Sequence, residues 1–287
     1  MIRKIGTVLE MIKIQHSIFA LPWAFLGALY ALEKVPAIEP LLWILLAMVT
    51  ARAAAMTFNR ILDAKIDAKN PRTQNRAIPQ KKITKTFAGG FTLLMIILFL
   101  FSAYQLNDLC FKLAPIALLV TLGYSYTKRF TRFCHFILGI SLSMAPIGAW
   151  LAVRPEWHPT PLLFGLATLL WIAGADILYA CEDFDFDQNN KIRSIPAAIG
   201  IRNGMILSAF CHIGTIGALI TVGIMGKMGP VFHAGVGAIA LLLTYEHWIV
   251  RPDDLRRVNQ AFFHVNGIIS IAILFIGLGD LWQRGLL

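Results

Sequence analysis

Two acidic windows interrupt an otherwise apolar chain: Asn59-Arg60-Ile61-Leu62-Asp63-Ala64-Lys65-Ile66-Asp67 and Asp176-Ile177-Leu178-Tyr179-Ala180-Cys181-Glu182-Asp183-Phe184-Asp185-Phe186-Asp187. Together they contain seven of the 16 Asp and Glu residues of the protein. Each window follows directly on a long apolar run. Carboxylates at the edge of apolar segments are costly unless something binds them, and the usual partner is a hard divalent cation.

The composition indicates a membrane protein. Hydrophobic residues make up 57% of the chain and charged residues 15%, which is outside the range of soluble domains. Apolar runs long enough for one helix to cross a bilayer recur along the chain, and none alternates with the period of a β-strand. We therefore predict an all-α polytopic membrane protein, folded as a single integral-membrane domain over 1–287 without a soluble appendage. Its nine transmembrane helices are expected near 17–33, 40–58, 86–104, 109–126, 135–152, 161–181, 204–225, 230–249 and 261–281.

The placement of positive charge supports this topology. Of the 26 Lys and Arg residues, 19 fall in connections on one side of the nine spans and five on the other. Since Lys and Arg gather in cytoplasmic loops, the pattern predicts a cytoplasmic N-terminus and acidic windows on the cytoplasmic side. The net charge of +10 is then explained by topology and by anionic lipid. Nucleic-acid binding is disfavoured because the basic residues are spread over five loops.

The cysteine residues and the N-terminal segment indicate the cellular location. The four Cys residues are scattered without a C-x-x-C pattern, which is typical of buried free thiols. The first span follows a short N-terminal segment that has neither a convincing cleavage site nor the character of a transit peptide. We expect a bacterial inner-membrane protein whose partners are the lipid bilayer and its substrates, with no obligate protein partner.

Helical phase groups the acids into two faces. If each window continues its apolar run as an α-helix, the main polar residues of each window fall within about 80° of arc. Those residues are Asn59, Asp63 and Asp67 in the first window and Asp176, Tyr179, Asp183 and Asp187 in the second. Glu182 and Asp185 lie off the second face. Two facing carboxylate stripes suit Mg²⁺ with a substrate phosphate, whereas the lack of His and of paired Cys argues against zinc.

The alternative is that these acids are ordinary solvated loop residues. Against it, both windows share D-x-x-x-D spacing and lead to a matching R-x-I-P tail, at Arg76–Pro79 and at Arg193–Pro196. This favours two pseudo-repeated halves around one central site. Cations on the same side as the acids favour metal-bridged diphosphate over metal alone. They are Arg72, Arg76, Lys128, Arg129, Lys191 and Arg193.

With these motifs in view, the chain resembles the UbiA superfamily of intramembrane aromatic prenyltransferases, most closely the 4-hydroxybenzoate polyprenyltransferase branch. The family motifs N-D-x-x-D-x-x-x-D, R-T-x-x-R-x-x-P, Y-x-x-x-K-R and D-x-x-Y-A-x-x-D-x-x-x-D match segments beginning at Asn59, Arg72, Tyr124 and Asp176. Arg60 departs from the pattern, because many members have Asp there. At Arg60 and in the segment 14–22, the chain instead resembles a sub-branch of the family that includes the naphthoate prenyltransferases of the futalosine route to menaquinone.

The resemblance implies transfer of a polyprenyl group from an allylic polyprenyl diphosphate to the ring carbon ortho to the phenol of 4-hydroxybenzoate, in ubiquinone biosynthesis. The alternative acceptor is a dihydroxynaphthoate, for menaquinone. The implied cofactor is Mg²⁺, held by Asp63, Asp67, Asp183 and Asp187, with Asn59 as a further catalytic candidate. The implied substrate-binding residues are Arg52, Arg72, Arg76, Lys128, Arg129, Tyr124, Tyr179, Asp176, Lys191, Arg193 and His16.

Two questions stay open at this point. Arg52 lies deeper on the stripe of Asn59, so it is a candidate for binding the acceptor's carboxylate, or alternatively forms a buried ion pair with Asp176. Membrane transport is a second functional class, since repeats and intramembrane charges also mark carriers. Clustering of the acids on one membrane face, away from the midplane, favours the enzyme.

Overall fold

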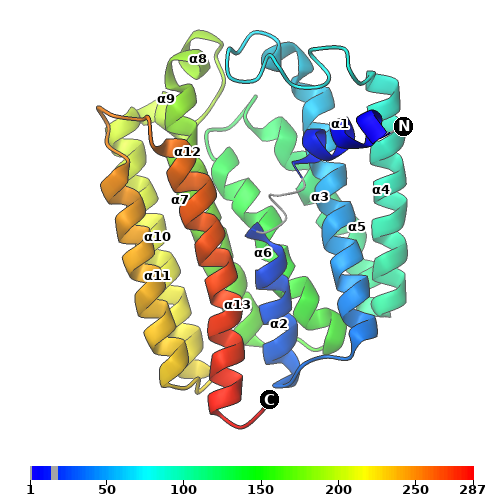
Figure 1. Cartoon of the computed structure of the whole chain (residues 1–287), viewed down its shortest axis with the longest axis vertical. Helices are drawn as coiled ribbons and strands as arrows, with labels where there is room; N and C mark the ends of the chain where they lie inside the picture. Colours follow the sequence, from blue (N-terminus) through cyan, green and yellow to red (C-terminus); the bar gives the residue numbers. More distant parts are fainter. Residues whose placement is uncertain (1, 14–18) are drawn as a thin grey trace.

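The protein is a bundle of long, roughly parallel and antiparallel helices (Figure 1). The computed structural model describes residues 2–13 and 19–287. Among these residues, helices of 12 residues or more build the bundle, and the first eight along the chain are α2 (Leu21–Leu32), α3 (Ile38–Asp67), α4 (Lys85–Leu106), α5 (Asp108–Thr127), α6 (Cys134–Val153), α7 (Pro159–Ala180), α10 (Ile201–Met225) and α11 (Pro230–Ile249). The ninth is α13 (Asn266–Gln283), which continues from α12 (Val258–Gln260) through a π-helical turn, η3 (Ala261–Val265).

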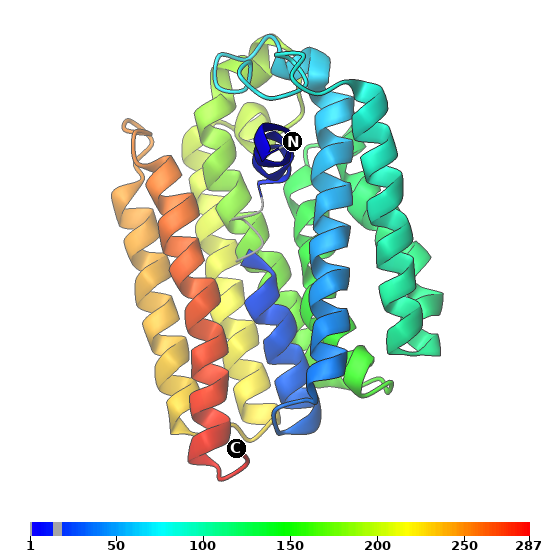
Figure 2. The same cartoon turned by 45° about the vertical axis from the view of Figure 1, so that its right-hand side comes forward.

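Short helices occupy the end of the bundle that carries the acidic windows. They are α1 (Ile2–Ile12), the 3₁₀ turn η2 (Cys181–Asp183), α8 (Phe184–Asn189) and α9 (Ile195–Ile199). Helix α1 lies crosswise beside α3 near this end of the bundle, and the C-terminus lies at the opposite end (Figures 1 and 2). The buried side chains Met11 and Ile12 of α1 pack in one cluster with Ala53 and Ala64 of α3, so α1 is fixed against α3.

The all-helical membrane-type fold is confirmed. Among the described residues, seven helical segments are long and apolar enough to cross a membrane: Ile38–Asp67, Lys85–Leu106, Asp108–Thr127, Cys134–Val153, Pro159–Asn189, Ile201–Met225 and Val258–Gln283. The other two predicted spans correspond to α2, which is apolar but only 12 residues long, and to α11. Polar side chains such as Glu246 and His247 lower the hydropathy of α11.

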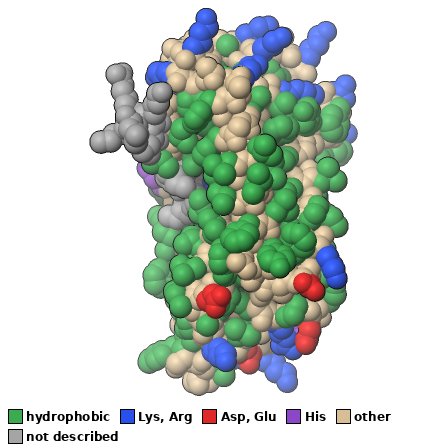
Figure 3. Space-filling view, turned by 90° about the vertical axis from the view of Figure 1, so that its right-hand side faces the viewer, with side chains coloured by type: hydrophobic (Ala, Val, Ile, Leu, Met, Phe, Trp, Pro, Cys, Tyr) green, Lys and Arg blue, Asp and Glu red, His purple; other side chains and the backbone are tan. Residues whose placement is uncertain are grey.

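The surface has the banding of a membrane protein. Figure 3 shows Lys and Arg at one end of the molecule, a broad hydrophobic band along its middle, and both acids and bases at the other end. Large side chains in this band, such as Leu93 and Ile97 of α4 and Leu119 of α5, are more than half exposed. Exposed apolar surface of this extent is what a lipid-facing belt requires.

Local sequence explains several helix starts. The Thr84 hydroxyl accepts a hydrogen bond from the Phe87 N–H at the start of α4, and Asn107 Oδ1 accepts one from the Cys110 N–H (2.9 Å) at the start of α5. Such caps satisfy backbone donors that have no partner within the helix. Pro residues begin α7 and α11, where their fixed φ is compatible with the first helical turn.

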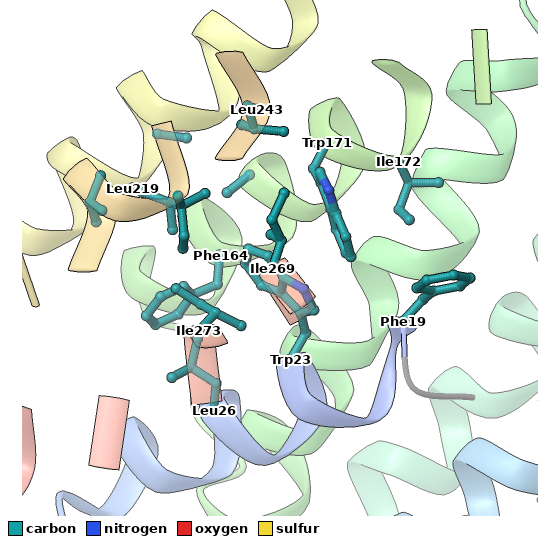
Figure 4. Packing of buried hydrophobic residues seen from close by; sticks show 14 of the residues in the cluster. Phe19, Trp23, Leu26, Phe164, Trp171, Ile172, Leu219, Leu243, Ile269 and Ile273 are labelled. Atoms are coloured by element: carbon teal, nitrogen blue, oxygen red, sulfur yellow. The ribbon is translucent and has the colours of Figure 1, made fainter. Parts of the chain in front are cut away.

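One side of the bundle is tightly packed. Helices α2, α7, α10, α11 and α13 share a core that includes the fully buried Trp23, Trp171 and Phe164 (Figure 4). Small residues bring neighbouring helices into backbone contact, as is usual in membranes. A Cβ atom at Gly27 of α2 would lie 2.3 Å from the Pro146 carbonyl oxygen of α6, and one at Gly139 of α6 would lie 2.5 Å from the Leu169 carbonyl oxygen of α7. These contacts fix one wall of the chamber described below.

The second acidic window differs from the expected continuous helix. Helix α3 runs unbroken through the first window, but α7 ends at Ala180 and is followed by the 3₁₀ turn η2. The N–H of Cys181 is shared between the carbonyls of Leu178 and Tyr179, which tightens the chain here. A 3₁₀ turn has 3.0 residues per turn, so the phase extrapolated from α7 at 3.6 is lost before Asp187.

Candidate active site

A chamber of about 1200 Å³ lies inside the bundle. Its wall includes residues of α1, α3, α4, α5, α6 and α7 and the segment 259–264. At the end near α1 the lining is polar, with Arg72, Arg76 and Asn59. It is mostly apolar further along and reaches Leu106 and Leu151, near the opposite ends of α4 and α6. The chamber therefore joins a charged end to an apolar interior that runs along most of the bundle.

The two acids of the first window are buried and paired with cations. Asp63 is 1% exposed; its Oδ2 accepts a hydrogen bond from Lys128 Nζ, and its Oδ1 accepts one from Arg129 Nη2 at 2.9 Å. Asp67 is 4% exposed, and its Oδ1 accepts a hydrogen bond from Arg76 Nη1 at 2.7 Å. The other oxygen of Asp67, Oδ2, is buried without a hydrogen-bond partner. One acceptor of this face is therefore available to a cation.

Asp183 of the second window is tied to the first by the loop after α3. Its carboxylate accepts hydrogen bonds from Nε (3.0 Å) and Nη2 of Arg72 and from Asn70 Nδ2 (3.0 Å). Arg72 also donates to the Tyr179 hydroxyl (2.6 Å) and lies over the Tyr179 ring. Burial lowers the pKa of Arg72, but its hydrogen bond to Asp183 raises the pKa above the ordinary value, so the guanidinium stays charged. The second window is thus joined to the loop that directly follows the first window in the sequence.

Asp187 is turned toward a different recess. It is buried and lines a hollow of about 810 Å³ together with Lys191 and Arg193. Arg193 Nη1 donates to the Phe130 carbonyl (2.6 Å), so its role differs from that of Arg76 in the matching tail. Arg76 and Arg193 occupy matching positions in the two sequence repeats, but they make different contacts in the structure. The change of helical phase at η2 accounts for the different direction of Asp187.

Asp176 pairs with a histidine, and the expected alternative of an Arg52–Asp176 ion pair is wrong. The Ile195 N–H donates to His135 Nε2 (3.2 Å), which leaves His135 Nδ1 as the donor to Asp176 Oδ2 at 2.7 Å. Arg52 lines the chamber, and its Nε is buried without a hydrogen-bond partner. A buried guanidinium donor without a partner is costly, and the side chain that carries it lines the chamber.

Most of the remaining predicted residues line the chamber. Asn59 of α3, Tyr124 of α5 and Tyr179 of α7 line the chamber. Arg60 does so as well, although 7% exposed, and it places a positive charge where an acid is usual in the resembled motif. His16 lies outside the described residues.

No preformed metal cage is present within residues 2–13 and 19–287, because no group of three or more His, Cys, Asp or Glu side chains is arranged to hold an ion. Each of Asp63, Asp67 and Asp183 has a cationic partner in its place. The residues nevertheless fit Mg²⁺ chemically: the donors are hard carboxylate oxygens, and Asp67 Oδ2 lacks a partner.

Sequence reasoning missed several residues at this site. Asn70 and His135 bind Asp183 and Asp176, and Phe262 and Phe263 line the chamber beside Tyr179. Asn70 follows the first window closely and could have been found as a polar residue next to the motif. Phe262 and Phe263 gave no signal, since they belong to an apolar run like any other.

A family model, curated relatives and solved structures all relate this chain to the same protein family. The model of the UbiA prenyltransferase family matches residues 20–268. The chain is 31% identical over 262 residues, covering 91% of it and 95% of the relative, to the 4-hydroxybenzoate octaprenyltransferase of Vesicomyosocius okutanii. The apo structure of a UbiA homologue from Aeropyrum pernix is similar with a TM-score of 0.83 and 27% identity, covering 96% of this chain and 99% of the other. A UbiA homologue from Archaeoglobus fulgidus, solved with DMAPP and Mg²⁺, shares the fold (TM-score 0.76, 16% identity, coverage 96% and 99%).

Proposed function

The chain belongs to the UbiA prenyltransferase family, and on that premise we propose that it transfers a polyprenyl group to the ring carbon ortho to the phenol of 4-hydroxybenzoate. The donor is an allylic polyprenyl diphosphate, the reaction depends on Mg²⁺, and the product enters ubiquinone biosynthesis. The observation that carries the proposal is the chamber, which is lined at one end by Arg72 and Arg76, the partners of Asp183 and Asp67, and which continues into an apolar interior. A diphosphate with a long hydrocarbon tail matches both parts. The name of the relative from Vesicomyosocius okutanii supports the acceptor.

The membrane arrangement is part of the proposal. Helices α2 and α11 complete nine spans with the seven long apolar segments. The single domain lies in a bacterial inner membrane with its N-terminus and its active site on the cytoplasmic side, and its two pseudo-repeated halves surround the site. The excess of Lys and Arg at the end that carries the acids supports this orientation.

The four acids have a common role in this scheme. Asp63, Asp67, Asp183 and Asp187 are the residues that would hold Mg²⁺, with Asn59 as a further ligand or as an orienting group. When bound, Mg²⁺ neutralises charge on the diphosphate leaving group.

The cations that now pair with the acids bind the diphosphate oxygens. They are Arg72, Arg76, Lys128 and Arg129. Charge-assisted hydrogen bonds of this kind stabilise the negative charge that grows as the bond to the prenyl carbon breaks. Lys191 and Arg193 line the same hollow as Asp187, and we assign them a weaker, longer-range neutralisation of the negative charge on the diphosphate.

Arg52 and its neighbours form the acceptor end of the site. The guanidinium of Arg52, whose Nε has no hydrogen-bond partner, binds the carboxylate of the aromatic acid, and Tyr124 also lines the chamber. Asp176, fixed by His135, faces the chamber beside Tyr179 and is within the group of residues that orient the acceptor. His16 belongs to the segment that resembles the naphthoate branch and is assigned to acceptor contact.

An acceptor panel tests the function. The protein in detergent or in membranes is supplied with one polyprenyl diphosphate, Mg²⁺ and either 4-hydroxybenzoate or a dihydroxynaphthoate, and the products are identified by mass spectrometry. We expect diphosphate release with formation of C-prenylated 4-hydroxybenzoate. Preference for the naphthoate would reassign the acceptor and keep the chemistry. Absence of diphosphate release with every acceptor would favour a carrier.

Arg52→Ala is expected to raise the KM for 4-hydroxybenzoate by about 10- to 100-fold, because a hydrogen bond to a charged group contributes roughly 1.5–3 kcal/mol. The KM for the prenyl donor should change little. The methyl ester of 4-hydroxybenzoate, which lacks the carboxylate charge, should lose most of this difference between the two proteins. Arg202→Ala, at an exposed position of α10, is the matched control. An equal effect of Arg52→Ala on both substrates would indicate a structural role.

A further inference from the structure

The wall of the chamber next to the ion pairs is built by the π-helical turn η3. It inserts a wide turn between α12 and α13, and it carries Phe262 and Phe263, which both line the chamber. A single π-turn inside a helix is rare and is frequent at functional sites, because it redirects side chains that a regular helix would place elsewhere. The turn therefore calls for an explanation in terms of what it presents to the chamber.

Four aromatic side chains that line the chamber meet at this position: Tyr179, Phe262, Phe263 and Phe19, whose ring is stacked with that of Phe263 (6.4 Å) and edge-on to that of Phe262 (5.7 Å). The rings of Tyr179 and Phe262 are stacked with centroids 4.4 Å apart, and Phe263 lies edge-on to both, at 5.8 Å from Tyr179 and 5.0 Å from Phe262. We call Tyr179, Phe262 and Phe263 the aromatic wall. Its Tyr179 ring is covered by the Arg72 guanidinium, whose carbon is 4.9 Å from the centroid. The wall thus begins one ring away from the ion pair between Arg72 and Asp183.

A buried polar cluster holds the π-turn in place. Asn266 Nδ2 donates to the Ala261 carbonyl (3.3 Å) at the start of the turn and to Glu246 Oε1 (2.7 Å), and Asn266 Oδ1 accepts from Trp171 Nε1 (2.5 Å). These three side chains are at most 2% exposed. Polar side chains inside a membrane bundle are costly and are usually retained for a function. Here they fix the backbone from which Phe262 and Phe263 project.

We infer that the aromatic wall stabilises the allylic cation of the transfer reaction and keeps water from it, and that Asn266 is a positioning residue for the wall. The inference rests on the proposed function. The wall borders Arg72, one of the cations to which the proposed function assigns the diphosphate, and this places it next to the proposed position of the first prenyl carbon. Aromatic faces attract a cation, and an unactivated phenyl ring is a much weaker nucleophile toward it than water or the phenol ring of the acceptor. The Tyr179 hydroxyl is directed to Arg72.

The chemistry defines two competing outcomes. The bond between the first prenyl carbon and oxygen breaks, and its electron pair leaves with the diphosphate. In transfer, the acceptor's ring carbon supplies an electron pair to the cation, a carbon–carbon bond forms, and the ring proton is lost to the released diphosphate. In hydrolysis, a water oxygen supplies the pair, loses a proton to the diphosphate, and yields the prenyl alcohol. An intact wall favours the first outcome over the second.

The test is the ratio of prenyl alcohol to prenylated acid in Phe262→Leu and Phe263→Leu, measured together with total diphosphate release. Leucine keeps an apolar side chain but removes the π-face. We expect the ratio to rise on the order of tenfold in each variant, given the usual strength of a desolvated cation–π contact. Phe262→Trp, which retains a π-face, should keep a ratio close to that of the unaltered protein. Phe275→Leu on the exposed side of α13 is the control.

The outcomes are distinguishable. An unchanged ratio in both leucine variants, with normal diphosphate release, would overturn the aromatic wall and leave the proposed function intact. Failure of the unaltered protein to release diphosphate would overturn the proposed function itself. Asn266→Ala should shift the ratio in the same direction as the leucine variants, because the π-turn loses its anchor. A ratio equal to that of the unaltered protein would remove the positioning role.

Discussion

Asp63→Asn is expected to abolish prenyl transfer while the protein still inserts and folds. The substitution keeps the shape of the side chain but removes its negative charge. This charge pairs with Lys128 and Arg129 and, in the proposed reaction, binds the metal. Loss of several kcal/mol of charge stabilisation in the transition state corresponds to a decrease in rate on the order of 10³-fold. Folding should survive because the side chains of Lys128 and Arg129 are 28% and 34% exposed and can be solvated without Asp63.

The measurement compares kcat for transfer with the amount of protein recovered in a monodisperse form from membranes. Asp183→Asn should behave in the same way, since Asp183 holds Arg72 on the other side of the site. Asp185→Asn is the matched control, because Asp185 belongs to the same window but is exposed. Substantial activity in both Asp63→Asn and Asp183→Asn would contradict the assignment of the two windows to a diphosphate site.

The first half of this site could be predicted because it depends on one regular helix. Helix α3 continues without a break from the membrane span through Asp63 and Asp67, so the spacing of the acids gives their common face directly. The second half could not be predicted in the same way. Its phase changes at the 3₁₀ turn Cys181–Asp183, and a one-dimensional pattern of apolar residues holds no information on where a helix tightens.

The sequence also could not predict which side chains from distant segments pair with one another. The charges of Arg52 and Asp176 invited an ion pair, yet Asp176 is satisfied by His135, whose other ring nitrogen is fixed by a backbone N–H. That choice depends on how α6 packs against α7, where Gly139 allows close approach. The same holds for Phe262 and Phe263, which reach the chamber only because a π-turn redirects them. The charges of a site can be listed from a sequence, but their partners follow from packing.

Removal of divalent cations is expected to stop the reaction and to leave the fold almost unchanged. In proteins whose acids converge on a structural metal, chelation exposes like charges to one another and the fold is lost with the metal. This protein has a different arrangement, because Asp63, Asp67 and Asp183 are each neutralised by a basic side chain without any metal. The carboxylates therefore do not repel one another in the metal-free state.

The experiment follows diphosphate release and thermal unfolding side by side, with EDTA and after addition of excess Mg²⁺. Transfer should fall to background with EDTA and return with Mg²⁺, whereas Tm should change by roughly a few degrees at most, as expected for a weakly bound ligand. Arg76→Ala sharpens the comparison, because it leaves Asp67 without its cation while Asp67 is only 4% exposed. In that variant Mg²⁺ should raise Tm more than in the unaltered protein, since the metal replaces a missing charge. Transfer that persists in EDTA would contradict the Mg²⁺ requirement, and extensive unfolding in EDTA would contradict the self-neutralised site.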